Sequence, residues 1–516
     1  EINHNLEQQH LQQRYGNWKE TTSTSPSNRH LGHYHSLLQK PPLDPNSEEA
    51  KTFQVATKQI WNIHHGIHKY AITHAYCFKR WQNVVNTMIE KDPGDPRIYR
   101  LRVIHLYEAD YSLLIGNAFR QVLHKMEDAN LMNPGCYGNR PTRSAHDPVL
   151  IEVLQLEYSW ATRHPHIKFS NDATSCYDRI IPSVSNVLAR SCGIHHNVSS
   201  IHGDMLQHAC YRIKTTLGIS EKHYSHCPEF PIFGTGQGST SSPNIWAINA
   251  STYFNVYDKH CFGATYTNQS LTKTLHLGMT GFVDDNNSQV TGLPEDMSHP
   301  LAQGDSETKL IKRCSHDAQL WNDILWASGG ALEVPKCHYA YLKFQFESNG
   351  KPFLTRGQHG PPVQITDQDG VSMNIKQLSC DDPYKILGTQ QAAVLFQEKQ
   401  FQVLFKKATK LNKALSCSSV SRTGAYVFYS SVFLTSVGYP LALCHLTGKQ
   451  LQALQSKIVP TVLQKMGYVN SFKRDLIYGP TRYGGQGFHN LIYEQGIQAV
   501  ILLIRTLRSP GQPQQK

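Results

Sequence analysis

Two adjacent acids, Asp284 and Asp285, follow an apolar run that ends at Val283 and precede a polar run. This pattern predicts a β-hairpin with both acids at or beside its turn. Neighbouring carboxylates repel each other unless a cation lies between them, and hard divalent cations such as Mg²⁺ prefer oxygen ligands of this kind. An Asp-Asp pair alone is more often a solvated pair of loop acids. The elements upstream must therefore decide its role.

A glycine-rich stretch, residues 234–243, lies upstream and reads Gly-Thr-Gly-Gln-Gly-Ser-Thr-Ser-Ser-Pro. It is predicted to open a helix that continues to about residue 257. Glycines let the backbone approach a ligand closely, and a helix N-terminus favours negative charge. The stretch lacks the Lys-Ser/Thr ending of a nucleotide P-loop, so that motif is excluded.

Basic side chains recur on two predicted elements. In the predicted strand 99–106, alternation places Arg100 and Arg102 on one face, where forked hydrogen bonds can hold phosphate oxygens. In the predicted helix 396–416, a face other than the apolar one carries Lys406, Lys410 and Lys413, which can lie along a nucleic-acid backbone. Each pattern also fits a solvated surface, so neither decides alone.

Composition narrows the class of protein. The chain has 516 residues and a formal net charge of +11. That length predicts about two to four subdomains. The charge favours a polyanionic partner, although solubility alone would also account for it. The 12 cysteines are scattered without a C-x2-C pair, which excludes a zinc ribbon and indicates a reducing compartment. His64 and His68, four apart on a predicted helix, can share a metal or be ordinary helix-surface histidines.

The chain begins with Glu1 and shows no signal segment, so we expect a fragment or a processed chain that is not secreted. An uncharged stretch, residues 425–444, is long enough to span a bilayer. It also holds serines, threonines, a glycine and a proline, which favours a buried helix. We therefore expect no membrane partner.

The remaining elements follow from hydrophobic periodicity. Helices are expected over residues 48–90, 110–128, 147–160, from 182, 199–217 and 306–328, and through most of the chain after 390. Short strands are expected over residues 167–171, 336–344 and 384–388, with hairpins or loops over 346–380.

Three features stand in order along the chain: Asp172 with Tyr177, then Gln237-Gly238-x-x-x-Ser242-Pro243, then Phe282-x-Asp284-Asp285. This set resembles the A, B and C motifs of the reverse transcriptase family. Weaker matches in the same order resemble its fingers motifs, its D-motif lysine and its E-motif primer grip. They are Arg102-Val103-Ile104, Tyr137-Gly138-Asn139-Arg140-x-x-x-Ser144-Ala145-x-Asp147, Lys336 and Leu387-Gly388.

The resemblance covers about residues 90 to 390. The later stretch Tyr478-Gly479-Pro480-x-x-x-Gly484-Gly485-x-Gly487 is similar to the enzymes of non-LTR retroelements. Nothing resembles an endonuclease, an integrase or an RNase H module, so the chain is expected to be part of a larger element protein. Phe282 stands where tyrosine is commoner in the family, and Glu333 where many relatives have asparagine.

The resemblance implies a catalytic and metal-binding set. Asp172 and Asp284 would hold two Mg²⁺ ions, with Mn²⁺ as the alternative ion, and Asp285 would be a weaker ligand or a support. Two ions about 4 Å apart activate the primer 3′-hydroxyl and neutralise the leaving pyrophosphate. Lys336 would act as a general acid toward that pyrophosphate, and Asp178 is interpreted as structural.

The resemblance to reverse transcriptases also implies contacts to the substrates. The aromatic ring of Tyr177 would lie under the sugar and exclude a 2′-hydroxyl, so deoxynucleotides are expected. Gln237 and Gly238 would form the floor under the template base and the nucleotide. The triphosphate would be bound by Arg102, and with it by Arg100 and Lys91. The residues expected to contact primer and template are Phe282, Leu387, Gly388, Lys406, Lys410 and Lys413.

The fold that the resemblance implies is α+β, a right-hand polymerase whose palm is a split βαβ, ferredoxin-like sheet. The expected order is a loose segment (1–50), a helical N-terminal extension with fingers (51–165), and a palm with part of the fingers (166–345). After the palm we expect loops with primer-grip-like strands (346–390), then a helical thumb (391–510), and finally a tail (511–516).

The leading functional hypothesis is an RNA-directed DNA polymerase that uses an RNA template, a DNA or RNA primer and deoxynucleoside triphosphates. Its location is expected to be intracellular, and nuclear by the type of element. The alternative is an inactive or recruited copy of the fold that binds nucleic acid, although decay should remove the acids first and they are present. A third hypothesis, an RNA-synthesising polymerase, is disfavoured by Tyr177.

Overall fold

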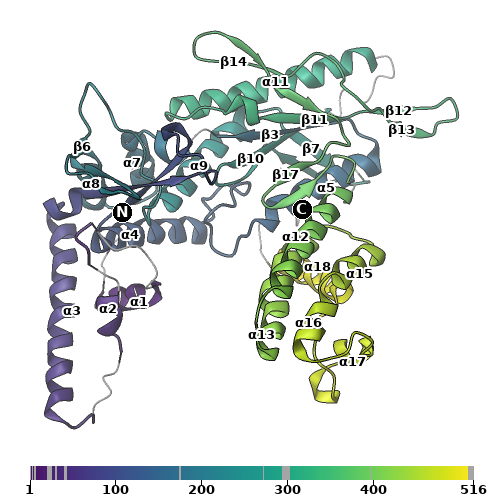
Figure 1. Cartoon of the computed structure of the whole chain (residues 1–516). Helices are drawn as coiled ribbons and strands as arrows, with labels where there is room; N and C mark the ends of the chain where they lie inside the picture. The colour runs from purple at the N-terminus through teal and green to yellow at the C-terminus, as the bar shows by residue number, and fades with distance from the viewer. Residues whose placement is uncertain are drawn as a thin grey trace. The chain divides into compact units, whose positions relative to one another are not determined.

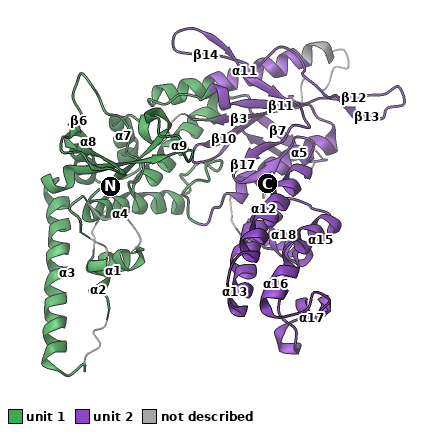
Figure 2. Cartoon of the chain, viewed as in Figure 1, with its two compact units in different colours: residues 1–141, 172–260, 320–333 green, residues 142–171, 261–319, 334–516 purple. Residues whose placement is uncertain are grey.

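The computed structural model describes residues 2, 4, 7–19, 26–29, 32–39, 44–173, 176–270, 272–292, 303–395 and 397–508. Helices and strands both contribute, and the sheets mix parallel and antiparallel pairs, which is compatible with the predicted α+β class (Figure 1). The chain divides into two compact units (Figure 2). Unit 1 comprises residues 1–141, 172–260 and 320–333, and unit 2 comprises residues 142–171, 261–319 and 334–516.

Unit 1 contains a sheet in the order β2-β1-β4-β5, with β6 also paired to β4. Strand β1 is antiparallel to β2 and parallel to β4. The helices pack their apolar faces into one core, and α4 is buried along most of its length. The elements of this unit are α1 (Gln8–Asn17), α2 (Gly32–Ser36), α3 (Glu48–His74), η1 (Lys79–Gln82), β1 (Asn83–Glu90), η2 (Ile98–Arg100), β2 (Leu101–Leu106), α4 (Ala109–Asp128), α6 (Cys176–Arg179), α7 (Pro182–Ser191), α8 (His196–His208), β4 (Cys210–Thr215), β5 (Gly218–Ile219), β6 (Tyr224–Ser225) and α9 (Ser242–His260).

Unit 2 contains a sheet in the order β16-β11-β3-β10-β9, several two-stranded hairpins and a helical C-terminal part. Two elements cross the boundary: α11 enters unit 1 at residue 320, and the last residue of β3 belongs to unit 1. The strands are β3 (His166–Asp172), β7 (Ala264–Thr267), β8 (Thr274–Leu277), β9 (Met279–Phe282), β10 (Asp285–Thr291), β11 (His338–Leu342), β12 (Phe344–Phe346), β13 (Pro352–Leu354), β14 (Gln364–Thr366), β15 (Ser372–Asn374), β16 (Lys376–Leu378), β17 (Tyr384–Ile386) and β18 (Thr389–Gln391). The helices are α5 (His146–Thr162), α11 (Gln303–Ala327), η4 (Val334–Lys336), α12 (Glu398–Ser416), α13 (Arg422–Val427), η5 (Phe428–Phe433), α14 (Leu434–Leu441), α15 (Gly448–Ser456), α16 (Val459–Met466), α17 (Arg474–Tyr478), η6 (Thr481–Tyr483) and α18 (Leu491–Arg508).

Two predicted helices of unit 1 are wrong in their second halves. The helix expected over 48–90 ends at His74, where Ala75 adopts a left-handed conformation with φ 51°, and residues 83–90 form β1. The helix expected over 199–217 ends at His208, and residues 210–215 form β4. Both segments have apolar residues at helical spacing, but β1 and β4 pair along their lengths, and this pairing outweighs the local pattern.

Other predictions are confirmed with small shifts of boundary. Helices α4, α5, α7, α9, α11 and α12 and the hairpins within residues 346–380 lie where the sequence places them. The strand expected over residues 384–388 ends at Ile386, and the chain then turns back into β18. Helix α1 lies in the segment expected to be loose, yet Leu11 and Tyr15 of this helix are buried. The predicted strand 99–106 begins at Leu101, so Arg100 lies in η2 and does not share a strand face with Arg102.

The uncharged stretch 425–444 covers α13, η5 (a π-helical turn) and α14, and one face of it packs into the C-terminal core. Tyr429, Phe433 and Val437 are fully buried on that face, as a buried helix requires. Within the described ranges, no helix is both long enough and apolar enough to cross a membrane.

Candidate functional site

The acid pair lies on the β9–β10 hairpin, as predicted. Phe282 pairs with Asp285, so Val283 and Asp284 form the two-residue turn. Val283 has a φ of 63°, which is uncommon for a β-branched residue. Backbone strain of this kind persists only where the surroundings enforce it, and it is concentrated at functional sites. Both carboxylate residues are exposed, so they are accessible to solvent ions.

The body of β10 is polar and buried, which explains how the hairpin is held. Asn287 Oδ1 accepts a hydrogen bond of 2.7 Å from the Ser170 hydroxyl of β3. The Gln289 side-chain amide donates to Gln155 of α5. Because buried polar groups are costly without partners, these bonds fix the register of β10 against its neighbours. The end of β3 and the start of β10 therefore lie side by side in this sheet.

Asp172 is the last residue of β3, as the sequence predicts, and it is half-buried. Its carbonyl oxygen accepts a hydrogen bond of 2.9 Å from the backbone N–H of Glu333, and Ala173 bridges Leu332. These contacts anchor the residue within unit 1. The three acids are hard oxygen donors, a donor set that suits Mg²⁺ or Mn²⁺. No group of three or more His, Cys, Asp or Glu side chains forms a ready metal cluster in the described part of the chain. The two-ion assignment stays a prediction.

The glycine-rich stretch of unit 1 is held tightly by backbone contacts. The N–H groups of Gly234 and Thr235 donate to the carbonyls of Ile180 and Tyr177 at 2.8 and 2.9 Å. The Gln237 carbonyl accepts a bond of 2.7 Å from the His105 N–H of β2. The stretch thus lies between β2 and the α6 segment, and it brings their backbones together in one place.

All three glycines of this stretch have positive φ values, and at two of them a Cβ atom would meet backbone. Gly234 has a φ of 90°, and a Cβ atom there would lie 2.6 Å from the Tyr177 carbonyl oxygen. Gly238 has a φ of 118°, and a Cβ atom there would lie 2.5 Å from the His105 carbonyl oxygen. Such distances are far shorter than van der Waals contact, and L side chains rarely adopt such φ values. Close backbone approach therefore explains both residues.

The residues predicted to bind the nucleotide largely belong to this neighbourhood. Tyr177 is half-buried, with its ring centroid 6.3 Å from that of Trp246 in α9. Desolvation raises the pKa of Asp178, whereas the backbone N–H of Gln237 and the positive charge of Lys91 oppose that shift. Arg102 is exposed on β2, the strand that contacts the glycine-rich stretch. Unit 1 thus combines cations, a half-buried aromatic ring and a tight backbone turn.

Arg100 differs from Arg102. Its guanidinium lies 2.5 Å from Asp92 and 3.5 Å from Asp95, both in the β1–β2 connection. Exposed ion pairs of this kind contribute little energy. A triphosphate contact by Arg100 would need these pairs to be exchanged, and its predicted role stays a prediction. Lys91 donates its backbone N–H to the Arg100 carbonyl at 3.1 Å.

The other predicted site residues lie in unit 2. Lys336 is exposed in η4 just before β11, and Phe282 is half-buried at the end of β9. Leu387 and Gly388, with φ values of 43° and 85°, form the two-residue turn between β17 and β18. Two successive positive φ values are typical of tight hairpin turns. The Tyr439 hydroxyl of α14 donates to the Leu387 carbonyl at 2.7 Å, which fixes the turn against the helical part.

Helix α12 has the two faces that the sequence predicts. Leu404, Ala408 and Leu415 are buried, and the three lysines of the basic face, Lys406, Lys410 and Lys413, are exposed. The opposite placement of apolar and cationic side chains leaves the lysines available to a polyanion.

A buried polar group in unit 2 was not predicted. Lys168 of β3 is almost fully buried, with its Nζ atom 2.5 Å from Glu152 Oε1 and 3.5 Å from the centre of the Tyr384 ring. The Tyr384 hydroxyl donates to the same carboxylate oxygen at 2.6 Å. Burial lowers the pKa of Lys168 to about 8, although Glu152 opposes that shift. The only signal in the sequence was a lysine that stands between two apolar residues, Ile167 and Phe169, of a strand.

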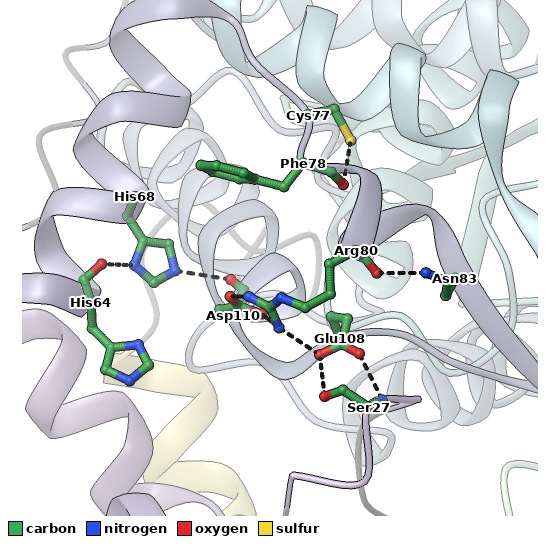
Figure 3. A network of polar contacts seen from close by, with 9 residues as sticks. All are labelled: Ser27, His64, His68, Cys77, Phe78, Arg80, Asn83, Glu108 and Asp110. Carbon is green, nitrogen blue, oxygen red and sulfur yellow. Dashed lines mark hydrogen bonds and ion pairs between the residues drawn. The ribbon is translucent and has the colours of Figure 1, made fainter. Parts of the chain in front are cut away.

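His64 and His68 do not form a metal site. His68 is fully buried, and its ring nitrogens contact the carbonyl oxygens of His64 and Asp110 at 2.9 and 3.0 Å. Burial lowers the pKa of His68, so the neutral ring can donate to one carbonyl at a time. Nearby, Arg80 forms ion pairs with Glu108 and Asp110, and Glu108 accepts bonds from the backbone and hydroxyl of Ser27 (Figure 3). These contacts are structural.

Comparison of the sequence with models of known protein families and with curated proteins finds no match.

Proposed function

We propose that the chain is an RNA-directed DNA polymerase of the reverse transcriptase type. The observation that carries the proposal is the β9–β10 hairpin, which presents Asp284 and Asp285 at its turn beside β3, the strand that ends in Asp172. In this proposal the β16-β11-β3-β10-β9 sheet is the palm, the sheet of unit 1 belongs to the fingers, and α12 to α18 form the thumb.

The proposed roles follow from the side chains. Asp172 and Asp284 would hold two Mg²⁺ ions, with Asp285 as support, and the ions would stabilise charge on the reacting oxygens. Arg102 and Lys91 would bind the triphosphate electrostatically, and Tyr177, whose carbonyl contacts the tight turn at Gly234, would exclude a 2′-hydroxyl. Lys336 would give a proton to the leaving pyrophosphate. The lysines of α12 would bind the phosphates of the template–primer duplex without reading sequence.

Primer extension on an RNA template tests the proposal. We expect the parent chain to extend a primer with deoxynucleotides and Mg²⁺. Asp284→Ala should lower the rate about a thousandfold, since loss of metal binding removes several kcal/mol of transition-state stabilisation. Asp369→Ala is the matched control, because Asp369 is an exposed acid at another hairpin turn of the same unit. Equal activity of parent and Asp284→Ala would contradict the metal assignment.

The basic face of α12 also fits the non-catalytic alternative, a nucleic-acid-binding protein of the same fold. Primer extension, together with a binding measurement, separates the polymerase from the non-catalytic binding protein. Tight binding of an RNA–DNA duplex, with no incorporation in Mg²⁺ or Mn²⁺, would favour the alternative.

A further inference from the structure

A pocket of about 240 Å³ lies in unit 1 between α1, α4 and the loop that precedes α9. Two arginines line it, Arg14 from α1 and Arg120 from α4, together with Trp18, Asn117 and Thr240. No aspartate or glutamate is among the described residues that line this pocket. Pockets for drug-sized ligands are usually about 300–1,000 Å³, so this space suits a compact charged group better than a whole large ligand. We refer to it as the arginine pocket.

The two guanidiniums have no counter-charge among the residues that the structure describes. Neither Arg14 nor Arg120 forms a hydrogen bond or an ion pair within the described part of the chain, although both are half-buried. Burial lowers the pKa of each, and the charge of Arg14 lowers that of Arg120 further. The contrast with Arg80 is direct, because Arg80 is paired with two buried acids in the same unit (Figure 3). Two like charges that are partly desolvated and unpaired favour a bound anion.

The two helices that line the pocket are packed into the core of unit 1. Helix α1 is fixed by Leu11 and by Tyr15, whose ring stacks on Tyr34 with centroids 4.2 Å apart. Helix α4 is buried over most of its length. At the floor, the Thr240 hydroxyl donates to the Ser112 carbonyl. Both arginine side chains therefore start from packed helices, so binding would order the side chains but no backbone segment.

We propose that the arginine pocket binds the phosphate group of a nucleotide or of a nucleic-acid strand end. One phosphate accepts forked hydrogen bonds from Arg14 and Arg120, and the attached nucleoside lies against the half-buried ring of Trp18. Asn117, which is buried in the lining, can supply an amide. None of the described residues that line it belongs to the β9–β10 hairpin, and the proposal does not depend on polymerase activity.

A binding experiment in EDTA isolates this site, because metal-dependent binding is then absent. The probe is a fluorescent trinucleotide with a 5′-phosphate, compared with the same trinucleotide with a 5′-hydroxyl, on the full chain. We expect the phosphate to tighten binding about tenfold or more. That preference should disappear in Arg14→Gln and in Arg120→Gln, and fall partially in Arg120→Lys, which keeps the charge but loses the fork.

Arg190→Gln is the matched control, since it removes one positive charge from an exposed position of α7 in the same unit. It should keep the preference for phosphate. Circular dichroism melts of all variants test whether they fold, and Trp18→Ala should weaken the trinucleotide a few-fold without changing the preference.

The outcomes separate the sources of phosphate. Displacement of the probe by uridine monophosphate, but not by inorganic phosphate at the same concentration, would assign the pocket to nucleotides. Displacement only by a 5′-phosphorylated strand would assign it to strand ends. Equal binding of both trinucleotides by the parent, or an unchanged preference in both glutamine variants, would overturn the proposal.

Discussion

The two units hold their candidate functional residues in different ways. In unit 1, β2 and α6 are joined to the glycine-rich stretch by backbone hydrogen bonds, and glycines permit the contact. In unit 2, the strands around the acid pair are held by buried side chains such as Asn287 and Lys168. A backbone-held site depends on the absence of side chains, whereas a site held by buried polar groups depends on complete pairing. Substitutions should therefore affect the two units by different mechanisms.

The largest expected loss of stability comes from breaking a buried ion pair in unit 2. Glu152→Ala leaves the Lys168 ammonium buried without its carboxylate, and we expect a loss of about 3–5 kcal/mol in the free energy of unfolding. The double change Glu152→Gln with Lys168→Met should be much less costly, because it leaves neither charge buried and keeps both side-chain volumes. Urea unfolding measures both.

Glu307→Ala is the control for Glu152→Ala. It removes a carboxylate 2.5 Å from Lys343 in the same unit, but both of these side chains keep contact with solvent. The expected loss is about 1 kcal/mol or less. Similar losses for Glu152→Ala and Glu307→Ala would show that burial of the Lys168 pair does not matter.

In unit 1 the corresponding change is Gly234→Ala. The new Cβ would meet the Tyr177 carbonyl, and we expect a loss of about 1–3 kcal/mol together with a higher KM for deoxynucleotides. Gly218→Ala is the control, because its φ of 131° is also unfavourable but no atom lies within 4 Å of its Cβ position. It should cost about 1 kcal/mol or less without changing KM. Equal effects would mean that φ alone requires glycine at 234.

Tyr177→Ala addresses selectivity. If the ring excludes a 2′-hydroxyl, ribonucleotide use relative to deoxynucleotide use should rise about tenfold or more, since steric discrimination of one small group is about 1–3 kcal/mol. Competition kinetics with the two triphosphates measures the ratio. An unchanged ratio would leave Tyr177 as a packing residue against Trp246.

The smallest expected effect is on pH dependence. Burial lowers the pKa of His105 to about 4, below its ordinary value of 6.5. The folded state thus binds fewer protons than the unfolded state, so this contribution to stability is present above pH 6.5 and is lost as pH falls toward 4. Amide hydrogen exchange of β1 and β2 at pH 7 and 6 should show a loss of about 0.7 kcal/mol, and His105→Phe should reduce it.

His223→Gln, at an exposed position of unit 1, is the control for the histidine experiment and should leave the pH dependence unchanged. An identical response of parent and His105→Phe would remove His105 as the cause.

The sequence predicted best where one local pattern decides. The acid pair at a hairpin turn, the end of β3 at Asp172 and the two faces of α12 all follow from short-range patterns and are present. The glycines of residues 234–238 were expected to let the backbone approach a ligand, which stays a prediction. The structure shows that two of them approach the backbones of Tyr177 and His105, and this choice of partner depends on residues far along the chain. No periodicity encodes that partner.

The sequence failed where tertiary pairing overrides a local pattern. Residues 83–90 and 210–215 carry apolar spacing that suits a helix, but they form β1 and β4 because each completes the other's hydrogen bonds. The Lys168–Glu152 pair and the arginine pocket were missed for a related reason. Each joins residues from separate elements, and a lone charged residue in a sequence does not reveal whether it is paired.

The contact between α4 and the loop before α9 has a consequence for related sequences. A Cβ atom at Gly116 would lie 2.4 Å from the Thr240 hydroxyl oxygen. Positions 116 and 240 therefore cannot vary independently. In homologues we expect glycine at 116 wherever a threonine occupies 240, and a larger residue at 116 only where 240 has become glycine or alanine. An alignment with many threonines at 240 opposite bulky residues at 116 would contradict this packing of α4.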